Sequence, residues 1–215
     1  TYTIAKEFTY DQKTGKYTKT LNVDAGKTYT VTETNYTVTG YAVKVYDASS
    51  STELTGSAMA ITSGTTAAGS TQTVAFENAY TQLGNLKLKK TVTGDYTGSK
   101  TYTFEVKDAN GNYYDENGTP STTAVTVSVA GNSEVTISNI PAGTYTVTED
   151  TAAAKVTGYT LQVTGSGANV SVIKGNTAEA EIKNNYTQEK GSLEITKNVT
   201  GDLTTSKAYT FTVQD

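Results

Sequence analysis

Three polar residues that could react with one another stand at positions where the sequence pattern favours apolar side chains. Side chains of a strand alternate between two faces, so residues two positions apart share a face. Each of the three follows two apolar residues of its own parity: Lys90 follows Leu86 and Leu88, Glu149 follows Tyr145 and Val147, and Asn184 follows Ala180 and Ile182. The pattern therefore predicts a cation, an acid and an amide pointing into one core.

The same three residue types recur at core parity elsewhere in the chain. This second set comprises Lys197 behind Leu193 and Ile195, Glu33 behind Tyr29 and Val31, and Asn78 behind Phe76. The copies also decide between neighbours, because Lys89 corresponds to Thr196 and Asn185 corresponds to Ala79. A single such residue would usually lie at a strand end with its polar head in water. All three types at core parity in both copies favour a shared buried site.

A buried set of these residue types has a specific reactivity. Burial disfavours charge, so an amine and a carboxylic acid are both driven toward their neutral forms. A neutral lysine amine is a nucleophile. A neutral glutamic acid can hydrogen-bond the asparagine carboxamide, polarise its carbonyl and carry protons to the departing ammonia. The predicted product is a lysine–asparagine isopeptide bond that forms once and is kept.

The composition of the chain argues against other kinds of chemistry. The 215 residues contain no Cys and no His, which removes disulfides, thiol nucleophiles, histidine catalysis and most transition-metal sites. We therefore expect no turnover enzyme, no metal site and no cofactor. A net charge of −4 has the wrong sign for a nucleic-acid binder, and no apolar run approaches the roughly 20 residues of a membrane span. The absence of a signal peptide and a sorting motif leads us to expect an excerpt of a longer protein.

The elements that must hold these residues are expected to be strands. Runs such as "KTYTFEV" and "GTYTVTE" alternate with a period of two between turns rich in Gly, Asn, Asp and Pro, and no segment has helical apolar spacing over three turns. Thr, Tyr and Val, which favour strands, are abundant. The predicted fold class is all-β, with repeats of an Ig-like antiparallel β-sandwich.

Internal repeats define the expected domains. "KTVTGD" recurs as "KNVTGD" and "KTYTFEVKD" recurs as "KAYTFTVQD", each 107 positions later. Residues 83–189 hold every element once and are expected to form a complete domain. Residues 1–82 are expected to form a domain that lacks its first two strands. Residues 190–215 hold the first two strands of a further domain, which is either split or donated.

The ordered motifs "LKLKKTVTGD", "YTFEV", "GTYTVTED" and "AEIKNNY" resemble the isopeptide-forming collagen-adhesin B-type (CnaB-like) domains and pilin domains of Gram-positive surface proteins. The resemblance covers residues 83–189 and both partial repeats. In that family the lysine lies on the first strand, the glutamate in a "YxVTE" box and the asparagine on the last strand. The resemblance therefore implies two cross-links: Lys90–Asn184 with Glu149 as proton shuttle, and Lys197–Asn78, between chains or repeats, with Glu33 as proton shuttle.

A bond between the first and last strands predicts a mechanical role. In a string of domains, tension would enter on the first strand, cross the covalent bond and leave on the last strand. We expect a structural stalk or fibre segment of a surface adhesin or pilus-like protein, extracellular and on the bacterial cell surface. Its expected partners are neighbouring copies of itself or adjacent repeats, joined head-to-tail, without nucleic acid or membrane.

The alternative function is a ligand-binding adhesin module that recognises a host protein or glycan, because sandwich loops often carry binding sites. The candidate loop is the polar stretch at residues 107–123. Its Asp108, Asp115 and Glu116 suggest Ca²⁺ ligands, but their spacing does not follow the EF-hand pattern. A solvated connection between strands is the favoured interpretation of this stretch.

The two partial repeats add up to one domain. Lys90 and Asn184 are 94 positions apart, and Lys197 and Asn78 would be 96 positions apart if the end of one chain continued into the start of another. Either the sequence is cut from a tandem array, or the last residues complete the open domain of the next molecule by strand addition. Within one chain the connector of roughly six residues reaches only about 20 Å, too short to join the halves past a whole domain.

Overall fold

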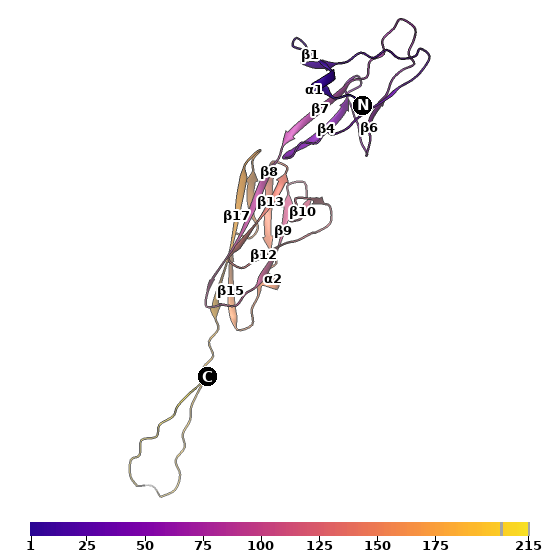
Figure 1. Ribbon diagram of the computed structural model, residues 1–215. Coiled ribbons are helices and arrows are strands. Elements are labelled where there is room, and N and C mark those ends of the chain that lie inside the picture. The colour runs from indigo at the N-terminus through magenta and orange to yellow at the C-terminus, as the bar shows by residue number, and fades with distance from the viewer. Residues whose placement is uncertain (203, 215) are drawn as a thin grey trace.

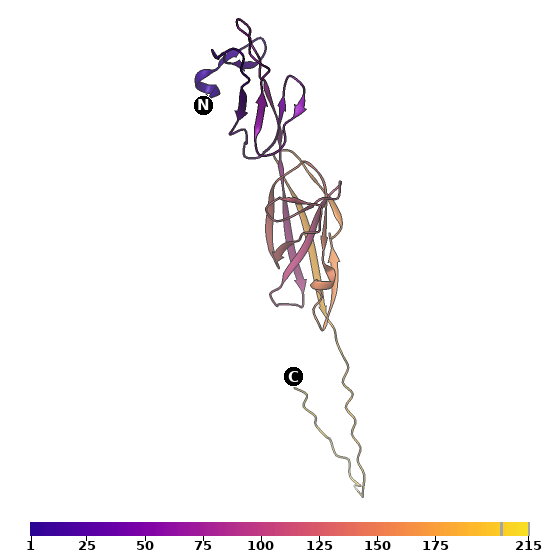
Figure 2. The same cartoon turned by 90° about the vertical axis from the view of Figure 1, so that its right-hand side faces the viewer.

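The computed structural model describes residues 1–202 and 204–214, which form three successive parts (Figure 1). An N-terminal unit runs to Gln82, a β-sandwich extends from Gly84 to Gln188, and the remaining residues form a tail. Figures 1 and 2 both show the sandwich lying between the N-terminal unit and the tail. Among the described residues, no helix has the length and apolar character needed to cross a membrane.

The sandwich consists of two packed sheets. One sheet has the strand order β13-β8-β17-β15, and the other has the order β11-β10-β9-β14-β16 with β12 also paired to β9. The elements are β8 (Gly84–Gly94), β9 (Thr101–Asp108), β10 (Tyr113–Tyr114), β11 (Pro120–Ser121), β12 (Val127–Ala130), β13 (Ser133–Ile140), β14 (Gly143–Glu149), α2 (Thr151–Ala154), β15 (Tyr159–Thr164), β16 (Ala168–Val172) and β17 (Thr177–Gln188). The predicted all-β, Ig-like sandwich is confirmed.

The first and last strands of the sandwich, β8 and β17, lie side by side and run parallel. The other strand pairs of the described residues are antiparallel, as predicted for the sandwich. A period of two records which face a residue occupies but not the direction of its strand, so the sequence pattern could not reveal this pair. Because β8 and β17 are parallel, the chain enters the sandwich at one end and leaves it at the other (Figure 1).

Alternate residues of these strands fill the core of the sandwich. Burial alternates along both β8 and β17, as the sequence pattern predicted. The largest fully buried side chains include three tyrosines, Tyr102, Tyr145 and Tyr186. Their hydroxyls form hydrogen bonds, as buried polar groups must. The core comprises Leu86, Leu88, Tyr102, Phe104, Val106, Tyr114, Val127, Val129, Ile137, Ile140, Tyr145, Val147, Ala154, Val172, Ala180, Ile182 and Tyr186.

The N-terminal unit contains the same later elements in smaller sheets. Its elements are α1 (Ile4–Glu7), β1 (Thr9–Asp11), β2 (Lys16–Thr18), β3 (Thr30–Glu33), β4 (Tyr41–Asp47), β5 (Thr52–Glu53), β6 (Met59–Thr62) and β7 (Phe76–Gln82). They pair as β1-β2, as β3-β6 and as β5-β4-β7. The pairing of β4 with β7 repeats that of β15 with β17, because Val45 faces Asn78 just as Val163 faces Asn184.

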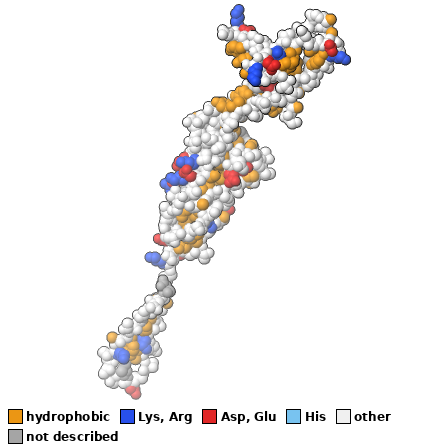
Figure 3. All heavy atoms as spheres, in the orientation of Figure 1, with side chains coloured by type: hydrophobic (Ala, Val, Ile, Leu, Met, Phe, Trp, Pro, Cys, Tyr) orange, Lys and Arg blue, Asp and Glu red, His pale blue; other side chains and the backbone are white. Residues whose placement is uncertain are grey.

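The N-terminal unit has almost no core of its own. Val45 is the buried apolar side chain of this unit, and Thr66 is its buried polar one. Figure 3 shows apolar side chains spread over the surface of this unit and of the tail. The exposed large apolar residues of the unit are Tyr2, Ile4, Tyr10, Tyr17, Leu21, Val23, Val31, Val38, Tyr41 and Tyr80.

A single residue, Leu83, joins the N-terminal unit to the sandwich. The Leu83 N–H donates to the carbonyl oxygen of Gly40 at 2.9 Å, and the Leu83 carbonyl accepts from the N–H of Gly175 at 2.8 Å. The last strand of one part, β7, therefore leads into the first strand of the next, β8, without a linker.

The tail forms no strand in its described residues and lies in the open. Its large apolar side chains are all exposed, namely Leu193, Ile195, Val199, Tyr209, Phe211 and Val213. A segment of this length cannot build a sandwich face by itself, because a two-stranded hairpin is at best marginally stable in water. Its assignment as the first two strands of a further domain therefore stays a prediction that needs a partner.

Candidate functional site

The predicted cluster of Lys90, Glu149 and Asn184 is supplied by two neighbouring strands of one sheet and one strand of the opposite sheet. Lys90 lies on β8 opposite Ile182, and Asn184 lies on β17 opposite Val92. The lysine and asparagine are thus offset by two residues across a parallel pair, on the same inward face. Glu149 ends β14 in the other sheet and points at them across the core.

The structure brings Lys90, Glu149 and Asn184 into direct contact. Lys90 Nζ donates to Glu149 Oε2 at 2.9 Å, and Asn184 Nδ2 donates to Glu149 Oε1 at 2.7 Å. The exposed fractions of the three residues are 1%, 3% and 0%. A single buried carboxylate therefore holds an amine on one oxygen and a carboxamide on the other.

Burial dominates the electrostatics of the lysine. Desolvation lowers the pKa of Lys90, and the hydrogen bond and charge of Glu149 offset this effect only in part. A lowered pKa increases the share of neutral amine, which is the nucleophilic form. A buried ion pair adds little net stability, because removing two charges from water costs about as much as their attraction returns. The cluster therefore needs an explanation other than stability as an ion pair.

Two aromatic rings of β9 cover the lysine amine. Lys90 Nζ lies 4.4 Å from the ring centre of Tyr102 and 5.7 Å from that of Phe104. The Tyr102 hydroxyl lies 3.2 Å from the hydroxyl of Tyr186, which donates to the carbonyl of Ala154 at 2.6 Å. The alternation in "TYTFEV" predicted both rings in the core, but it did not indicate which core residues would lie beside the amine.

One acceptor of the cluster has no partner. Asn184 Oδ1 is buried and receives no hydrogen bond. The oxygen and nitrogen of a carboxamide are assigned from their surroundings, and half a turn of the amide exchanges them. After that turn a protonated Glu149 would donate to Oδ1, which polarises the carbonyl toward attack by an amine. The buried Asn184 Oδ1 is thus an acceptor that only a proton donor within the cluster could satisfy.

The second predicted cluster is only partly assembled within one chain. Asn78 Nδ2 donates to Glu33 Oε1 at 2.7 Å, which repeats the contact between Asn184 and Glu149. Glu33 Oε2 and Asn78 Oδ1 are buried atoms without a hydrogen-bond partner. Lys197 is exposed in the tail, at the other end of the molecule, where its Nζ donates to the carbonyl of Asn198 at 3.0 Å. The acid and the amide are in place, and the amine is absent.

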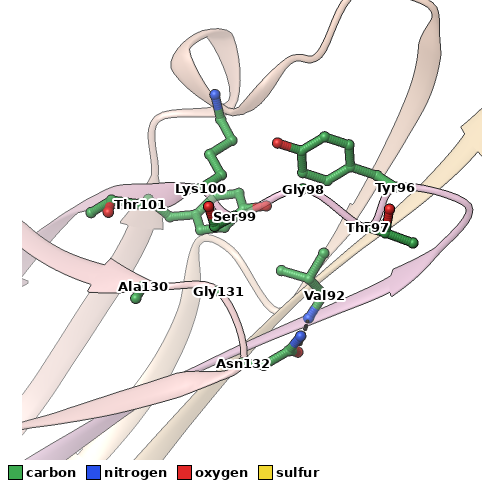
Figure 4. Close-up of a pocket in the computed structure, with 11 residues that line it drawn as sticks. Val92, Tyr96, Thr97, Gly98, Ser99, Lys100, Thr101, Ala130, Gly131 and Asn132 are labelled. Atoms are coloured by element: carbon green, nitrogen blue, oxygen red, sulfur yellow. Dashed lines mark hydrogen bonds between the residues drawn. The ribbon is translucent and has the colours of Figure 1, made fainter.

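A pocket of about 270 Å³ lies beside the first cluster without entering it (Figure 4). Residues 96–102, residues 130–132 and Val92 line it. Its main polar contact is internal, since the backbone N–H of Val92 donates to Asn132 Oδ1 at 2.8 Å, the dashed line in Figure 4. Tyr102 is common to the pocket wall and to the cover of the lysine amine, so its ring separates the two.

The acidic loop that suggested Ca²⁺ ligands uses its carboxylates to shape its own turns. Asp108 accepts from the backbone of Asn110 and Asn112 and from the hydroxyl of Tyr114. Asp115 accepts from the backbone N–H groups two and four residues later, at 3.0 and 2.8 Å. In residues 1–202 and 204–214, no group of three or more His, Cys, Asp or Glu side chains is placed to hold a metal ion.

The match to a family model lies within the sandwich. Residues 86–187 match a family described as a domain of unknown function, DUF5979. None of the curated proteins compared with the chain matches it. The chain is also similar to solved structures of Gram-positive pilins and adhesins, the class that its motifs resemble.

Three of these structures illustrate the extent of the similarity. The pilus-presented adhesin Spy0125 (Cpa) is 21% identical over 49% of this chain, with a TM-score of 0.32, and the chain spans only 27% of its length. The pilus 2b backbone protein of group B streptococcus is 14% identical, with 74% of this chain and 86% of that chain covered and a TM-score of 0.39. A Mobiluncus mulieris adhesin containing disulfide, isopeptide and ester cross-links is 19% identical, with 77% and 87% covered and a TM-score of 0.35.

Proposed function

We propose that this chain is a load-bearing stalk or fibre segment of a bacterial surface adhesin or pilus-like protein, held by a self-formed isopeptide bond between Lys90 and Asn184. One observation carries the proposal: Lys90 Nζ and Asn184 Nδ2 occupy the two oxygens of the same buried Glu149 carboxylate. Location outside the cell and on its surface is part of this proposal.

The proposed reaction exchanges one amide for another. Glu149 takes a proton from the Lys90 ammonium, and the neutral Nζ attacks Cγ of Asn184. The Nζ–Cγ bond forms and the Cγ–Nδ2 bond breaks, while Glu149 carries a second proton from Nζ to Nδ2, which leaves as ammonia. Glu149 keeps the first proton until the ammonia takes it to solvent as ammonium. The reaction happens once per molecule and regenerates no catalyst for another substrate, so the chain is not an enzyme.

The bond would decide how force crosses the sandwich. Since β8 and β17 are parallel, a pull applied at the two ends of the sandwich acts along both strands in shear. A Lys90–Asn184 bond would route that pull through residues 84–90 and 184–188. The 93 residues enclosed by the bond would carry none of it.

Intact-mass measurement of the purified chain tests this function. We expect a deficit of one ammonia in the wild-type chain and no deficit in Glu149→Gln, which keeps the shape of the side chain but cannot shuttle the proton. Asn185→Ala, which changes the neighbouring outward-facing amide, is the matched control and should keep the deficit. A wild-type chain with its full calculated mass would overturn the proposal.

A second level of the proposal concerns how segments join. We propose that copies join head-to-tail, with the tail of one molecule completing the N-terminal unit of the next by strand complementation and Lys197 bonding to Asn78. The assembled but amine-free pair of Glu33 and Asn78 favours this arrangement. Denaturing electrophoresis tests it, since a covalent ladder that Lys197→Ala abolishes supports joining and a wild-type monomer alone contradicts it.

A further inference from the structure

We infer that Ser166, which lies outside the buried cluster, positions the carboxylate that carries the protons. Its hydroxyl binds the main chain of Glu149 at the point where β14 loses a neighbouring strand. This inference rests on the isopeptide reaction proposed for the sandwich and adds a positioning residue to it. Ser166 touches none of the reacting atoms and acts through Glu149.

Glu149 lies just beyond the pairing of β14 with β16. The last pair of this ladder joins Val147 to Ala168, the first residue of β16. The same register, continued by two residues, would place Glu149 opposite Ser166. Ser166 belongs to the turn between β15 and β16 and not to a strand. The main-chain ladder to β16 has therefore ended where the acid is attached.

The main-chain N–H of Glu149 faces this end of the ladder. On the other side of β14, Glu149 is opposite Phe104 of β9. The next hydrogen bond toward β9 runs from the Asp150 N–H to the Thr103 carbonyl, at 2.9 Å. The Glu149 pair is thus a non-hydrogen-bonded pair of the antiparallel ladder, so the Glu149 N–H points away from β9. Because Glu149 is only 3% exposed, leaving this donor without a partner would be costly.

The Ser166 hydroxyl is the partner of this N–H. The Glu149 N–H donates to Ser166 Oγ at 2.9 Å. The two carboxylate oxygens of the same residue accept from Lys90 and Asn184. The serine therefore fixes the main chain from which the carboxylate extends, and it leaves both carboxylate oxygens to the cluster.

The N-terminal unit holds its acid at the same place by other means. There the ladder between β3 and β6 continues as far as Glu33, which is opposite Met59. Counted along the register of each strand pair, Met59 occupies the place of Ser166. Each acid accepts from its own asparagine at 2.7 Å. A paired strand thus holds one acid and a serine side chain holds the other, so the hydroxyl should matter only in the sandwich.

Two glycines shape the turn that presents the hydroxyl. Gly165 and Gly167 flank Ser166 with φ of +84° and +77°, a left-handed conformation that favours glycine. The Gly167 N–H donates to the carbonyl of Val147 at 2.7 Å, which fastens the turn to β14. The turn therefore holds Ser166 Oγ in a fixed position beside the end of this strand.

The same turn lies against the strand that carries the amide. A side-chain carbon at Gly165 would collide with the carbonyl oxygen of Glu181 on β17 and would lie 3.5 Å from Cα of Ile182. Asn184 follows two residues later on the same strand. The turn crosses from β15 in one sheet to β16 in the other and contacts both β14 and β17 on the way. Since the 2.7 Å contact between Glu149 and Asn184 also crosses between the sheets, the turn is placed to set this distance.

The rate of ammonia loss in folded chains tests the inference. Each full-length chain is purified in urea from insoluble material, its starting mass is checked for the absence of the bond, and folding is started by dilution. Circular dichroism follows folding, and the intact mass of acid-quenched samples follows ammonia loss. Ser166→Ala should fold but lose ammonia more slowly than the wild-type chain, on the order of tenfold to a hundredfold, because about 1 Å of misplacement can cost that much in rate.

Two further substitutions separate the hydroxyl from a general effect on the fold. Ser166→Thr keeps a hydroxyl on the same carbon and should restore most of the rate. Ser171→Ala makes the matched change at an exposed position of β16 and should leave the rate unchanged. If Ser166→Thr stays as slow as Ser166→Ala, the hydroxyl does not position the acid and the inference is overturned.

The outcomes also distinguish this inference from the function proposed for the sandwich. A folded Ser166→Ala chain that loses ammonia as fast as the wild-type chain overturns the positioning role and leaves the Lys90–Asn184 bond in place. A Ser166→Ala chain that does not fold would show that the hydroxyl serves the fold as a whole, which also overturns the positioning role. A folded wild-type chain that keeps its full mass overturns the proposed function and the role of Ser166 together.

Discussion

The sandwich and the N-terminal unit share one sequence pattern and differ in whether a core closes. The sandwich buries 17 apolar side chains in one cluster, whereas Val45 is the buried apolar side chain of the described N-terminal unit. Corresponding residues show the difference directly, since Val147 is 1% exposed and Val31 is 43% exposed. The difference shows what the first two strands of the sandwich, β8 and β9, contribute. Each of them belongs to a different sheet, so together they complete the core from both sides.

The polar residues teach a different lesson. The glutamate–asparagine contact has a length of 2.7 Å in both regions, although the lysine is present in only one. The later strands therefore position the acid and the amide without help from the first strand. In the sandwich, the lysine joins an acid and an amide that make the same contact in the N-terminal unit without it.

The largest expected effect comes from removing the proposed bond in the sandwich. Asn184→Ala should lower the unfolding free energy of the sandwich by about 4–5 kcal/mol if the bond acts on the unfolded chain as a disulfide would. Asn78→Ala, at the corresponding position, should leave the stability of the isolated chain nearly unchanged. Urea unfolding with intact mass checks both, and equal effects of the two substitutions would contradict the difference between the regions.

Val147 and Val31, which occupy corresponding positions, give a smaller test of the difference in apolar burial between the two regions. Val147→Ala should cost about 2 kcal/mol, because it removes two buried carbon atoms and leaves a cavity. Val31→Ala should change stability by less than about 0.5 kcal/mol, as is usual at exposed positions. Thermal or urea unfolding of the monomer measures both effects. In a head-to-tail assembly the cost of Val31→Ala should rise toward that of Val147→Ala.

The lowered pKa of Lys90 predicts how stability depends on pH when no bond can form. In Asn184→Ala, the unfolded chain binds a proton that the folded chain lacks between the lowered pKa and the ordinary value of about 10.4. Stability should therefore rise with pH across that window, by at most about 1.4 kcal/mol per pH unit. Urea unfolding from neutral to alkaline pH measures the slope. A flat profile would contradict the role of burial at Lys90.

The smallest expected effects come from surface ion pairs. Lys87 contacts Glu179 at 2.7 Å and Glu134 at 3.5 Å with 29% of its side chain exposed, whereas Lys44 contacts Glu53 at 2.9 Å with 61% exposed. Lys87→Ala should lower stability slightly, and Lys44→Ala should lower it still less. Both effects should shrink at high salt, because salt screens exposed charges. If the stability lost in these variants does not change with salt, the effect comes from packing of the aliphatic part of the lysine side chains and not from their charge.

Much of the fold and the site followed from parity alone. Alternation in the sequence predicted the sandwich, its inward residues and the three members of the buried cluster, because strand side chains repeat every two residues. The parallel direction of β8 and β17 and the contact of Lys90 with Tyr102 and Phe104 depend on topology and cross-sheet packing, which alternation does not encode. The single turn of α2 (Thr151–Ala154) is too short for a helical period, and it forms because Asp150 caps the N–H groups of Ala152 and Ala153.

The one-residue joint at Leu83 has a consequence for any array of such units. Because its N–H is bonded to one part and its carbonyl to the other, the joint has little freedom to bend or to swivel. A flexible linker would let successive units coil back on themselves, so that their end-to-end distance would grow only with the square root of the number of residues. Units joined as at Leu83 would instead add their lengths, and the array would behave as a rod that transmits torsion as well as tension.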